Sequence, residues 1–361
     1  MILSPVSTLR VVTRRVTNEL IFDTIETMNQ AQLEKFVNYL HREKWLVGGP
    51  TRSRVQALPA VDKIPESEIA IGRIANASDL ILDNRLPFFS FKRFLVPDKE
   101  VLFDYSAAKL VEKHSAHKVA LAGVNILDLK AINLYDQVFE KDVYYQARRR
   151  NTLLIGHSET PDIDDNFFEY RYEEDILEHL PFDIFLARGA KYFRVFTGSL
   201  KGQRILEHFG YKNYEHIQFS GPVKEGQPDE RMVKLRDKLK NHPNSKIWEE
   251  LGKRCIECGK CALVCPTCFC FRIDDKPSLE KQSGQRQRCW DSCFYQEFSE
   301  VAGPHKFLNT AAERIHFWYW HKFVRIPDEF DFVGCVGCGR CTKVCPVGID
   351  IKQVLNEIET S

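Results

Sequence analysis

The residues best suited to chemistry are the twelve cysteines, which are confined to one part of the chain. Residues 1–254 contain none, and all twelve lie between Cys255 and Cys345. Disulfides could use such a density in a small secreted domain, but this chain has 361 residues, no apolar signal segment and a fixed repeat of cysteine spacings. We therefore interpret the cysteines as reduced thiolates that bind metal.

Eight of the cysteines form two copies of the motif C-[VI]-x-C-G-[KR]-C-x-x-V-C-P. Three cysteines at steps of three residues can surround one [4Fe–4S] cluster, and the fourth, before proline, ligates the other cluster of a two-cluster pair. The motif therefore predicts two [4Fe–4S] clusters with crossed ligands. The ligands of cluster 1 are Cys255, Cys258, Cys261 and Cys345, and those of cluster 2 are Cys335, Cys338, Cys341 and Cys265.

Structural zinc is the alternative for these eight cysteines. Zinc sites usually use paired C-x₂-C units rather than three steps followed by Cys-Pro, so the spacing favours clusters.

Lys260 and Arg340 adjoin ligands, where a cation would favour the reduced, more negative cluster and raise its potential. The alternative is that both are ordinary surface charges.

The other four cysteines are candidates for further metal ligands. They are Cys268, Cys270, Cys289 and Cys293. Four thiols are the right number for a third cluster or a zinc ion, but their spacing matches no ligand pattern. The alternative is that they are buried or redox-inactive thiols beside the clusters.

The helices and strands expected from the sequence indicate a mixed, α+β fold class for the chain that positions these cysteines. We expect a basic segment and a helix over residues 1–50, a mixed α/β domain over 51–243 and an α-helical ferredoxin-type domain with two clusters over 244–361. Apolar periodicity predicts a helix from Asn29 that ends before Gly48. In the α/β domain we predict strands over 118–124, 152–155, 184–187 and 192–196, and helices over 127–139 and 200–209.

Further elements are predicted around the cysteine runs. Residues 221–228 resemble a linker, and residues 229–240 a solvated helix. Helical patterns cover 294–301 and 311–320, between the two runs. The aromatic run over 316–320 has helical spacing, so we interpret it as core packing rather than as an electron path.

Composition excludes several classes of partner. Lys and Arg number 51 against 50 Asp and Glu, so the chain is not a polycation that binds nucleic acid. No apolar stretch reaches the ~20 residues of a membrane helix, so we expect no membrane span. We expect a cytoplasmic protein; the basic first eighteen residues imitate an organellar presequence, which leaves organellar targeting as the alternative.

Longer motifs carry a family resemblance. The segments CALVCPTCFCF (261–271), WDSC (290–293) and GCVGCGRCTKVCPVGID (334–350) resemble the iron–sulfur subunit family shared by sulfhydrogenases, where it is the β subunit, and anaerobic sulfite reductases. FKRFLVPDKEVLF (91–103) and GVNILDLKAI (123–132) resemble that family's N-terminal domain. The resemblance implies an electron conduit between a flavin subunit that handles NAD(P)H and a catalytic subunit that makes hydrogen or reduces sulfur species.

The chain also departs from that family. Members usually carry GVRPCD where this chain has Asn125, Ile126 and Leu127 before Asp128. They also tend to have cysteines after the next strand, where this chain has residues 155–160 and 166–170 without one. If those family cysteines hold another metal site, this chain lacks it.

The motifs favour an electron-transfer subunit without a substrate site of its own. The sequence contains neither a G-x-G-x-x-G after a strand nor a G-x-x-x-x-G-K-[ST] loop, so hydride chemistry is expected on another chain. The rival is a self-contained iron–sulfur reductase whose α/β domain binds flavin or substrate. A third hypothesis is an adaptor whose clusters are chiefly structural.

Overall fold

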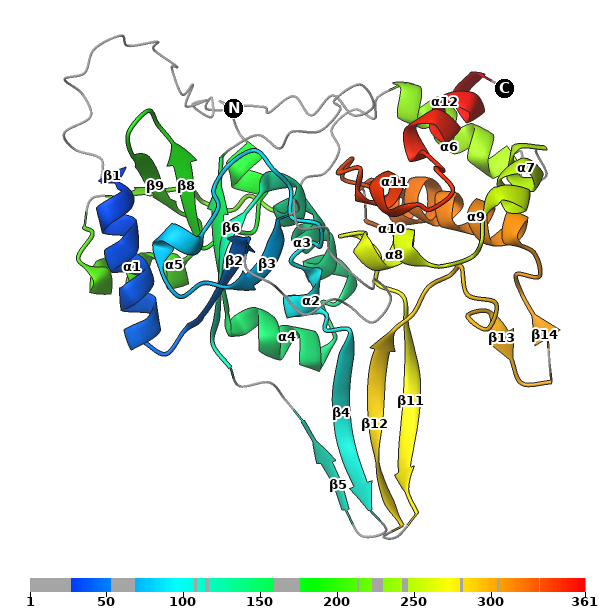
Figure 1. The fold of residues 1–361 in the computed structure, drawn as a ribbon, viewed down its shortest axis with the longest axis horizontal. Helices are drawn as coiled ribbons and strands as arrows, with labels where there is room; N and C mark the ends of the chain where they lie inside the picture. The colour runs from blue at the N-terminus through cyan, green and yellow to red at the C-terminus, as the bar shows by residue number, and fades with distance from the viewer. Residues whose placement is uncertain are drawn as a thin grey trace, which may run out of the picture.

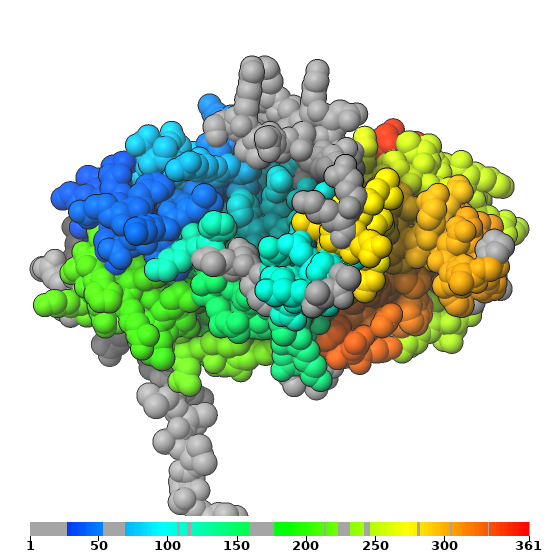
Figure 2. Space-filling view, turned by 90° about the horizontal axis from the view of Figure 1, so that it is seen from below, coloured from blue at the N-terminus to red at the C-terminus, as the bar shows by residue number. Residues whose placement is uncertain are grey.

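The computed structural model has two lobes and a narrow arm that projects beyond them (Figure 1). Figure 2 shows the α/β lobe in blue to green beside the cysteine-rich lobe in yellow to red. The predicted basic segment and most of the predicted linker lie outside the described residues. The structure describes residues 27–52, 69–106, 109–113, 117–158, 176–212, 214–222, 230–241, 246–279, 282–303, 305–330 and 332–360.

A mixed sheet forms the centre of the α/β lobe. Its strands lie in the order β1-β9-β8-β7-β6-β2-β3, and β10 also pairs with β9. Neighbours among β2, β6, β7 and β8 are parallel, whereas β3 and β9 are antiparallel to their partners β2 and β8. The bounds are β1 (Thr27–Met28), β2 (Leu46–Thr51), β3 (Ala70–Arg73), β6 (Val119–Val124), β7 (Thr152–His157), β8 (Ile184–Arg188), β9 (Phe193–Thr197) and β10 (Glu215–His216).

Helices cover both faces of this sheet because its parallel strands are buried on both sides. One core joins alternate strand residues such as Leu153 to α1 and α5, and the other joins residues such as Leu154 to α2, α3 and α4. The bounds are α1 (Gln30–Arg42), α2 (Lys92–Leu95), α3 (Ile126–Val138), α4 (Val143–Arg150) and α5 (Leu200–Phe209), with 3₁₀ turns η2 (Ala77–Asp79) and η3 (Ile176–His179).

Side-chain caps define where the helices begin. Asn29 and Gln32 form a reciprocal capping box at α1. At α3 the Asn125 side chain accepts a 2.9 Å hydrogen bond from the Asp128 N–H. The predicted helices at the start of the chain and over 127–139 and 200–209 are therefore confirmed, as are the four predicted strands.

The arm is a four-stranded antiparallel sheet in the order β11-β12-β4-β5. Because β4 precedes the cysteine runs and β11 lies between them, the arm joins the two lobes by backbone hydrogen bonds. At its base the buried Arg288 side chain pairs with Glu100 and Asp142. The bounds are β4 (Lys99–Ser106), β5 (Lys109–Glu112), β11 (Phe271–Ser278) and β12 (Ser283–Trp290).

The cysteine-rich lobe is mainly helical. Its core contains Trp248, Leu251, Ile315 and Leu355 from three different helices. The α9 helix continues through the π-helical turn η4 into α10. The bounds are α6 (Glu230–Asn241), α7 (Lys246–Arg254), α8 (Lys260–Val264), α9 (Ala311–Trp320), η4 (His321–Arg325), α10 (Ile326–Phe330), α11 (Arg340–Val344) and α12 (Ile351–Thr360), with the small hairpin β13 (Glu300–Val301) and β14 (His305–Lys306).

One predicted helix is wrong. Residues 294–299 form successive turns, and Glu300–Val301 is strand β13. The backbone there bonds over three residues, from Tyr295 N to Ser292 O and from Phe298 N to Tyr295 O, rather than over four. Burial of Phe294 in the core of the lobe produced an apolar spacing that imitated a helix.

Packing does not follow the expected domain boundaries at residues 51 and 244. Strand β2 and helix α1 belong to the α/β sheet and its core, although they precede residue 52. Leu235 and Leu239 of α6 pack in the core of the cysteine-rich lobe. Among the helices that the structure describes, none has the length and apolar character required to cross a membrane.

Candidate metal centre

Each cysteine run passes through a glycine into a short helix. Gly259 precedes α8 and Gly339 precedes α11, with φ angles of 69° and 70°. This left-handed conformation favours glycine, which has no Cβ atom. A Cβ atom at Gly259 would also lie 2.9 Å from the Cβ atom of Ser292. The motif therefore adopts the same local turn twice.

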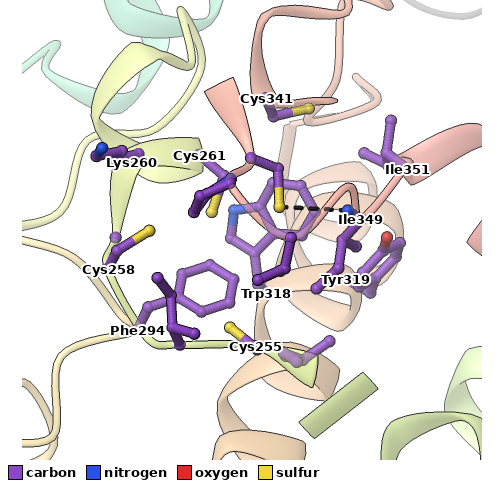
Figure 3. Close-up of a pocket in the computed structure, with 16 residues that line it drawn as sticks. Cys255, Cys258, Lys260, Cys261, Phe294, Trp318, Tyr319, Cys341, Ile349 and Ile351 are labelled. Atoms are coloured by element: carbon purple, nitrogen blue, oxygen red, sulfur yellow. Dashed lines mark hydrogen bonds between the residues drawn. The ribbon is translucent and has the colours of Figure 1, made fainter. Parts of the chain in front are cut away.

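Cavity 1 brings together the four cysteines predicted for cluster 1 (Figure 3). Three come from the first run, and Cys345 comes from the end of the second. Two backbone N–H groups donate to these sulfurs, from Glu257 to Cys255 Sγ at 3.4 Å and from Ile349 to Cys345 Sγ at 3.3 Å. The cysteines that line cavity 1 are Cys255, Cys258, Cys261, Cys341 and Cys345.

Cavity 2 brings together the four cysteines predicted for cluster 2. Cys265 comes from the end of the first run, and the other three come from the second. The Gly337 N–H donates to Cys335 Sγ at 3.4 Å, and the Thr267 hydroxyl lies 3.2 Å from Cys265 Sγ. The cysteines that line cavity 2 are Cys265, Cys335, Cys338 and Cys341.

The two cavities are adjacent, because Cys341 and Trp318 line both. Trp318 and Tyr319 lie on α9 and are buried in the core of the lobe, as the interpretation of the aromatic run predicted. Figure 3 shows both side chains beside the cysteines of cavity 1. These aromatic side chains therefore serve as core and as cavity wall.

A buried lysine contacts the wall of cavity 2. Lys322 is 2% exposed, and its Nζ lies 3.2 Å from Cys265 Sγ, 3.1 Å from Thr267 Oγ1 and 2.9 Å from the Gly334 carbonyl oxygen. Burial alone would lower the pKa of Lys322, but its electrostatic interactions with the sulfur atoms of Cys265 and Cys268 hold it well above its usual value. These contacts favour the charged form of Lys322.

Each run is also anchored by an arginine–carboxylate pair. Arg340 of the second run forms a bidentate ion pair with Asp128 of α3 at 2.8 and 3.0 Å, and both side chains are buried. In the first run Glu257 pairs with the buried Arg314 of α9. Glu257 has a φ of 55°, a left-handed conformation that is unusual for a residue with a side chain.

Arg340 does not fit the alternative that it is an ordinary surface charge. It is 3% exposed, and it also donates to the carbonyl of Pro87. Lys260, at the equivalent position of the first run, is partly exposed and lines cavity 1. The two flanking cations thus have different surroundings, and the effect of either on a cluster potential stays a prediction.

Burial raises the pKa of most thiols in these cavities. It raises the pKa of Cys335 to about 12, and it also raises the pKa values of Cys261, Cys338 and Cys341. Cys265 differs, because a hydrogen bond from Cys268, together with the charge of Lys322, holds its pKa well below the usual value. Metal binding by the protonated thiols would release their protons.

The donor sets fit [4Fe–4S] clusters. Thiolates are the usual ligands of such clusters, and each cavity offers at least four. The buried charge of Lys322 fits an anionic group in cavity 2. No three Cys, His, Asp or Glu side chains in the described part of the chain are arranged to hold a single metal ion. In a cluster, by contrast, each thiolate binds a different iron atom.

The other four cysteines do not gather at one place. Cys268 is hydrogen-bonded to Cys265, and Cys270 to Cys293, beside the two cavities. Cys289 lies instead on β12 of the arm, next to Asp274, where burial raises the pKa of its thiol. The structure thus separates Cys289 from the other three candidates.

Sequence reasoning missed several residues of this site. Lys322 and Trp318 are four residues apart on one continuous helical segment, and a lysine within a strongly aromatic run was a signal that it is buried. The Arg340–Asp128 pair had no such signal, because its partners are 212 residues apart. The left-handed backbone conformation of Glu257 had no signal in the sequence either, because a charged residue type does not indicate its φ angle.

Comparisons with known proteins identify the cysteine-rich lobe. A family model described as a 4Fe–4S dicluster domain matches residues 254–349, which include all twelve cysteines. Sulfhydrogenase 2 subunit beta of Pyrococcus furiosus is 29% identical over 304 residues, 79% of this chain and 87% of that protein. The predicted resemblance to an iron–sulfur subunit family is confirmed. The segment shared with this relative extends well beyond the dicluster domain.

A second relative is a formate dehydrogenase subunit beta of Methanocaldococcus jannaschii, which is 22% identical over 182 residues. The match covers 45% of this chain and 40% of that protein. Neither relative is named as a sulfite reductase subunit, so that part of the resemblance stays a prediction. No solved structure matches the chain significantly.

Proposed function

We propose that this chain is the electron-transfer subunit of a cytoplasmic multisubunit oxidoreductase. Cys255, Cys258, Cys261 and Cys345 would hold one [4Fe–4S] cluster, and Cys335, Cys338, Cys341 and Cys265 the other. Bound clusters would supply one-electron chemistry, with potentials that depend on hydrogen bonds to sulfur, net charge and solvent exposure. The chain's own residues hold, separate and shield them.

The observation that supports this proposal most strongly is the crossed arrangement of the cysteines. The last cysteine of each run lies in the cavity formed by the other run. Cys341 and Trp318 line both cavities, so two clusters held there would be neighbours. Electron transfer through the chain requires a short distance between the two clusters. The dicluster match over residues 254–349 points the same way.

The proposed partners are a flavin subunit that handles NAD(P)H and a catalytic redox subunit. Support comes from the names of the two relatives, which are beta subunits of a sulfhydrogenase and of a formate dehydrogenase. The catalytic partner on this proposal is of the hydrogenase or sulfur- or sulfite-reducing type. The chain contains no glycine-rich nucleotide motif that would make the flavin partner unnecessary.

An activity assay on the isolated full chain tests the proposal. Under anoxic conditions the chain should accept electrons from dithionite, and should neither oxidise NAD(P)H, produce hydrogen nor reduce sulfite. A flavin partner that co-purifies with the native chain should then restore bleaching of the clusters by NAD(P)H. NAD(P)H oxidation by the single chain, with flavin bound to its α/β lobe, would instead establish the self-contained reductase.

Metal analysis decides the role of the remaining cysteines. Two clusters correspond to about eight irons per chain, and three to about twelve. A value near twelve would make Cys268, Cys270 and Cys293 ligands of a third cluster, because their hydrogen bonds to Cys265 and to each other place them beside the cavities. Cys289→Ser is the control: its separate position on β12 predicts an unchanged iron content.

A further inference from the structure

The two cavities differ in their electrostatic surroundings, and Lys322 is the main cause. Its ammonium group has three N–H donors, and three acceptors lie within 3.2 Å: Cys265 Sγ, Thr267 Oγ1 and the Gly334 carbonyl oxygen. The Gly334 N–H in turn donates to the Lys322 carbonyl oxygen at 2.8 Å. The lysine is therefore held in one orientation, with one N–H directed at a cluster ligand.

The charge of Lys322 has no carboxylate counterpart. Within the described part of the chain no Asp or Glu forms an ion pair with it, and the centroid of the Trp318 ring lies 5.2 Å from Nζ. A buried, unpaired cation is strongly destabilising. The compensating negative charge must therefore come from the thiolates of cavity 2 and from what they bind.

Other cations near the cavities differ from Lys322. The buried Lys92 donates to the backbone carbonyl oxygens of Leu263 and Cys268 rather than to a ligand sulfur. Arg340 is neutralised by Asp128, and Arg314 by Glu257. Lys260 lines cavity 1, but within the described residues it forms no hydrogen bond to a cysteine sulfur. Among the described residues, a buried cation that has no carboxylate partner and donates to a ligand sulfur is thus found at cavity 2 and not at cavity 1.

We propose that Lys322 is a positioning residue that makes cluster 2 the higher-potential cluster of the pair. Its N–H and charge act through Cys265 and favour the reduced, more negative state. Electrons should therefore collect at cluster 2, beside α3 of the α/β lobe, and cluster 1 should be the lower-potential member. This inference rests on the proposed function, because it assumes that both cavities hold clusters.

Redox titration of the full chain, monitored by electron paramagnetic resonance, tests this inference. In Lys322→Met the reduced-to-oxidised ratio of cluster 2 at a fixed ambient potential should fall by about tenfold or more, the effect of losing one hydrogen bond to a charged group. Lys322→Arg should restore most of the ratio because it keeps the charge. Lys240→Met, the control, removes an exposed lysine of the same lobe that lines neither cavity, and it should leave both cluster potentials nearly unchanged.

Assignment of the two signals uses Cys255→Ser, which removes a ligand of cluster 1 only. The signal that survives in Cys255→Ser belongs to cluster 2. In the wild-type chain this signal should have the higher potential of the two. This comparison does not depend on how the Lys322 variants fold. Reversed order, or an unchanged potential in a Lys322→Met chain with full iron content, would overturn the inference. A chain that binds no iron would instead contradict the proposed function.

Discussion

The two cysteine runs share one motif, but different parts of the molecule hold them. In the first run the carboxylate of Glu257 belongs to the run, and its partner Arg314 comes from α9 of the same lobe. In the second run Arg340 belongs to the run, and its partner Asp128 comes from α3 of the other lobe. The arginine–carboxylate pair of the first run therefore lies within the cysteine-rich lobe, whereas the pair of the second run joins the two lobes.

This difference separates what the motif determines from what the surroundings determine. Cysteine spacing and the left-handed glycines are repeated, so both cavities present thiols in the same local geometry. The charged partners are not repeated, since Lys322, Asp128 and Arg314 lie outside both runs. A duplicated motif can thus supply two centres of the same kind that have different potentials and different mechanical support.

Ligand substitution has the largest expected effect, because it removes a whole cluster. Cys345→Ser should damage the cluster held by Cys255, Cys258 and Cys261, although Cys345 is closer in sequence to the second run. Cys265→Ser should damage the other cluster. Electron paramagnetic resonance of each variant distinguishes the two signals. Loss of the sequence-local cluster in each case would refute the crossed assignment.

Asp128→Asn should have the next largest effect, because it leaves the buried Arg340 without a counter-charge. The loss of stability should be about 3–5 kcal/mol. Urea denaturation under anoxic conditions measures it. Asp83→Asn is the matched control: its partner Arg85 is exposed, so less than about 1 kcal/mol should be lost. Equal effects of the two variants would show that the contact between the lobes does not stabilise cavity 2.

Glu257→Gln should cost less than Asp128→Asn. Arg314 is buried but Glu257 is partly exposed, and the amide oxygen of Gln can still accept a hydrogen bond. A loss of about 1–3 kcal/mol is expected in the same denaturation assay. Its effect should be confined to the cluster 1 signal. A shift of the cluster 2 signal alone would contradict the separate anchoring of the two runs.

Asn125→Ala should have the smallest effect, of about 1 kcal/mol, because it removes the cap of α3. The Asn125 side chain also donates to Asp128 at 3.0 Å, so the substitution loosens the anchor of cavity 2 without removing its charge. Asn29→Ala, which removes a cap in the α/β lobe far from the cysteines, is the control. Both should lower stability similarly, and only Asn125→Ala should alter the cluster 2 spectrum.

Local patterns predicted most of the elements and the two cysteine groups. The helix over 200–209 and the strands of the α/β sheet were predicted from the spacing of apolar residues, because that spacing reflects which side chains are buried. The turns at 294–299 were missed because Phe294 is buried without a helix around it. The Arg340–Asp128 pair and the Lys322 contacts join residues that are distant in sequence, so they depend on tertiary packing that a single sequence does not record.

The most direct test of the central claim is a count of iron, sulfide and unpaired spins in the fully reduced full chain. Two [4Fe–4S] clusters predict about eight irons and eight sulfides per chain, and two interacting paramagnetic centres. Cys341 and Trp318 line both cavities, so the spins should be close enough to broaden each other's signals. Four irons with a single isolated spin, or bound zinc without sulfide, would contradict the account.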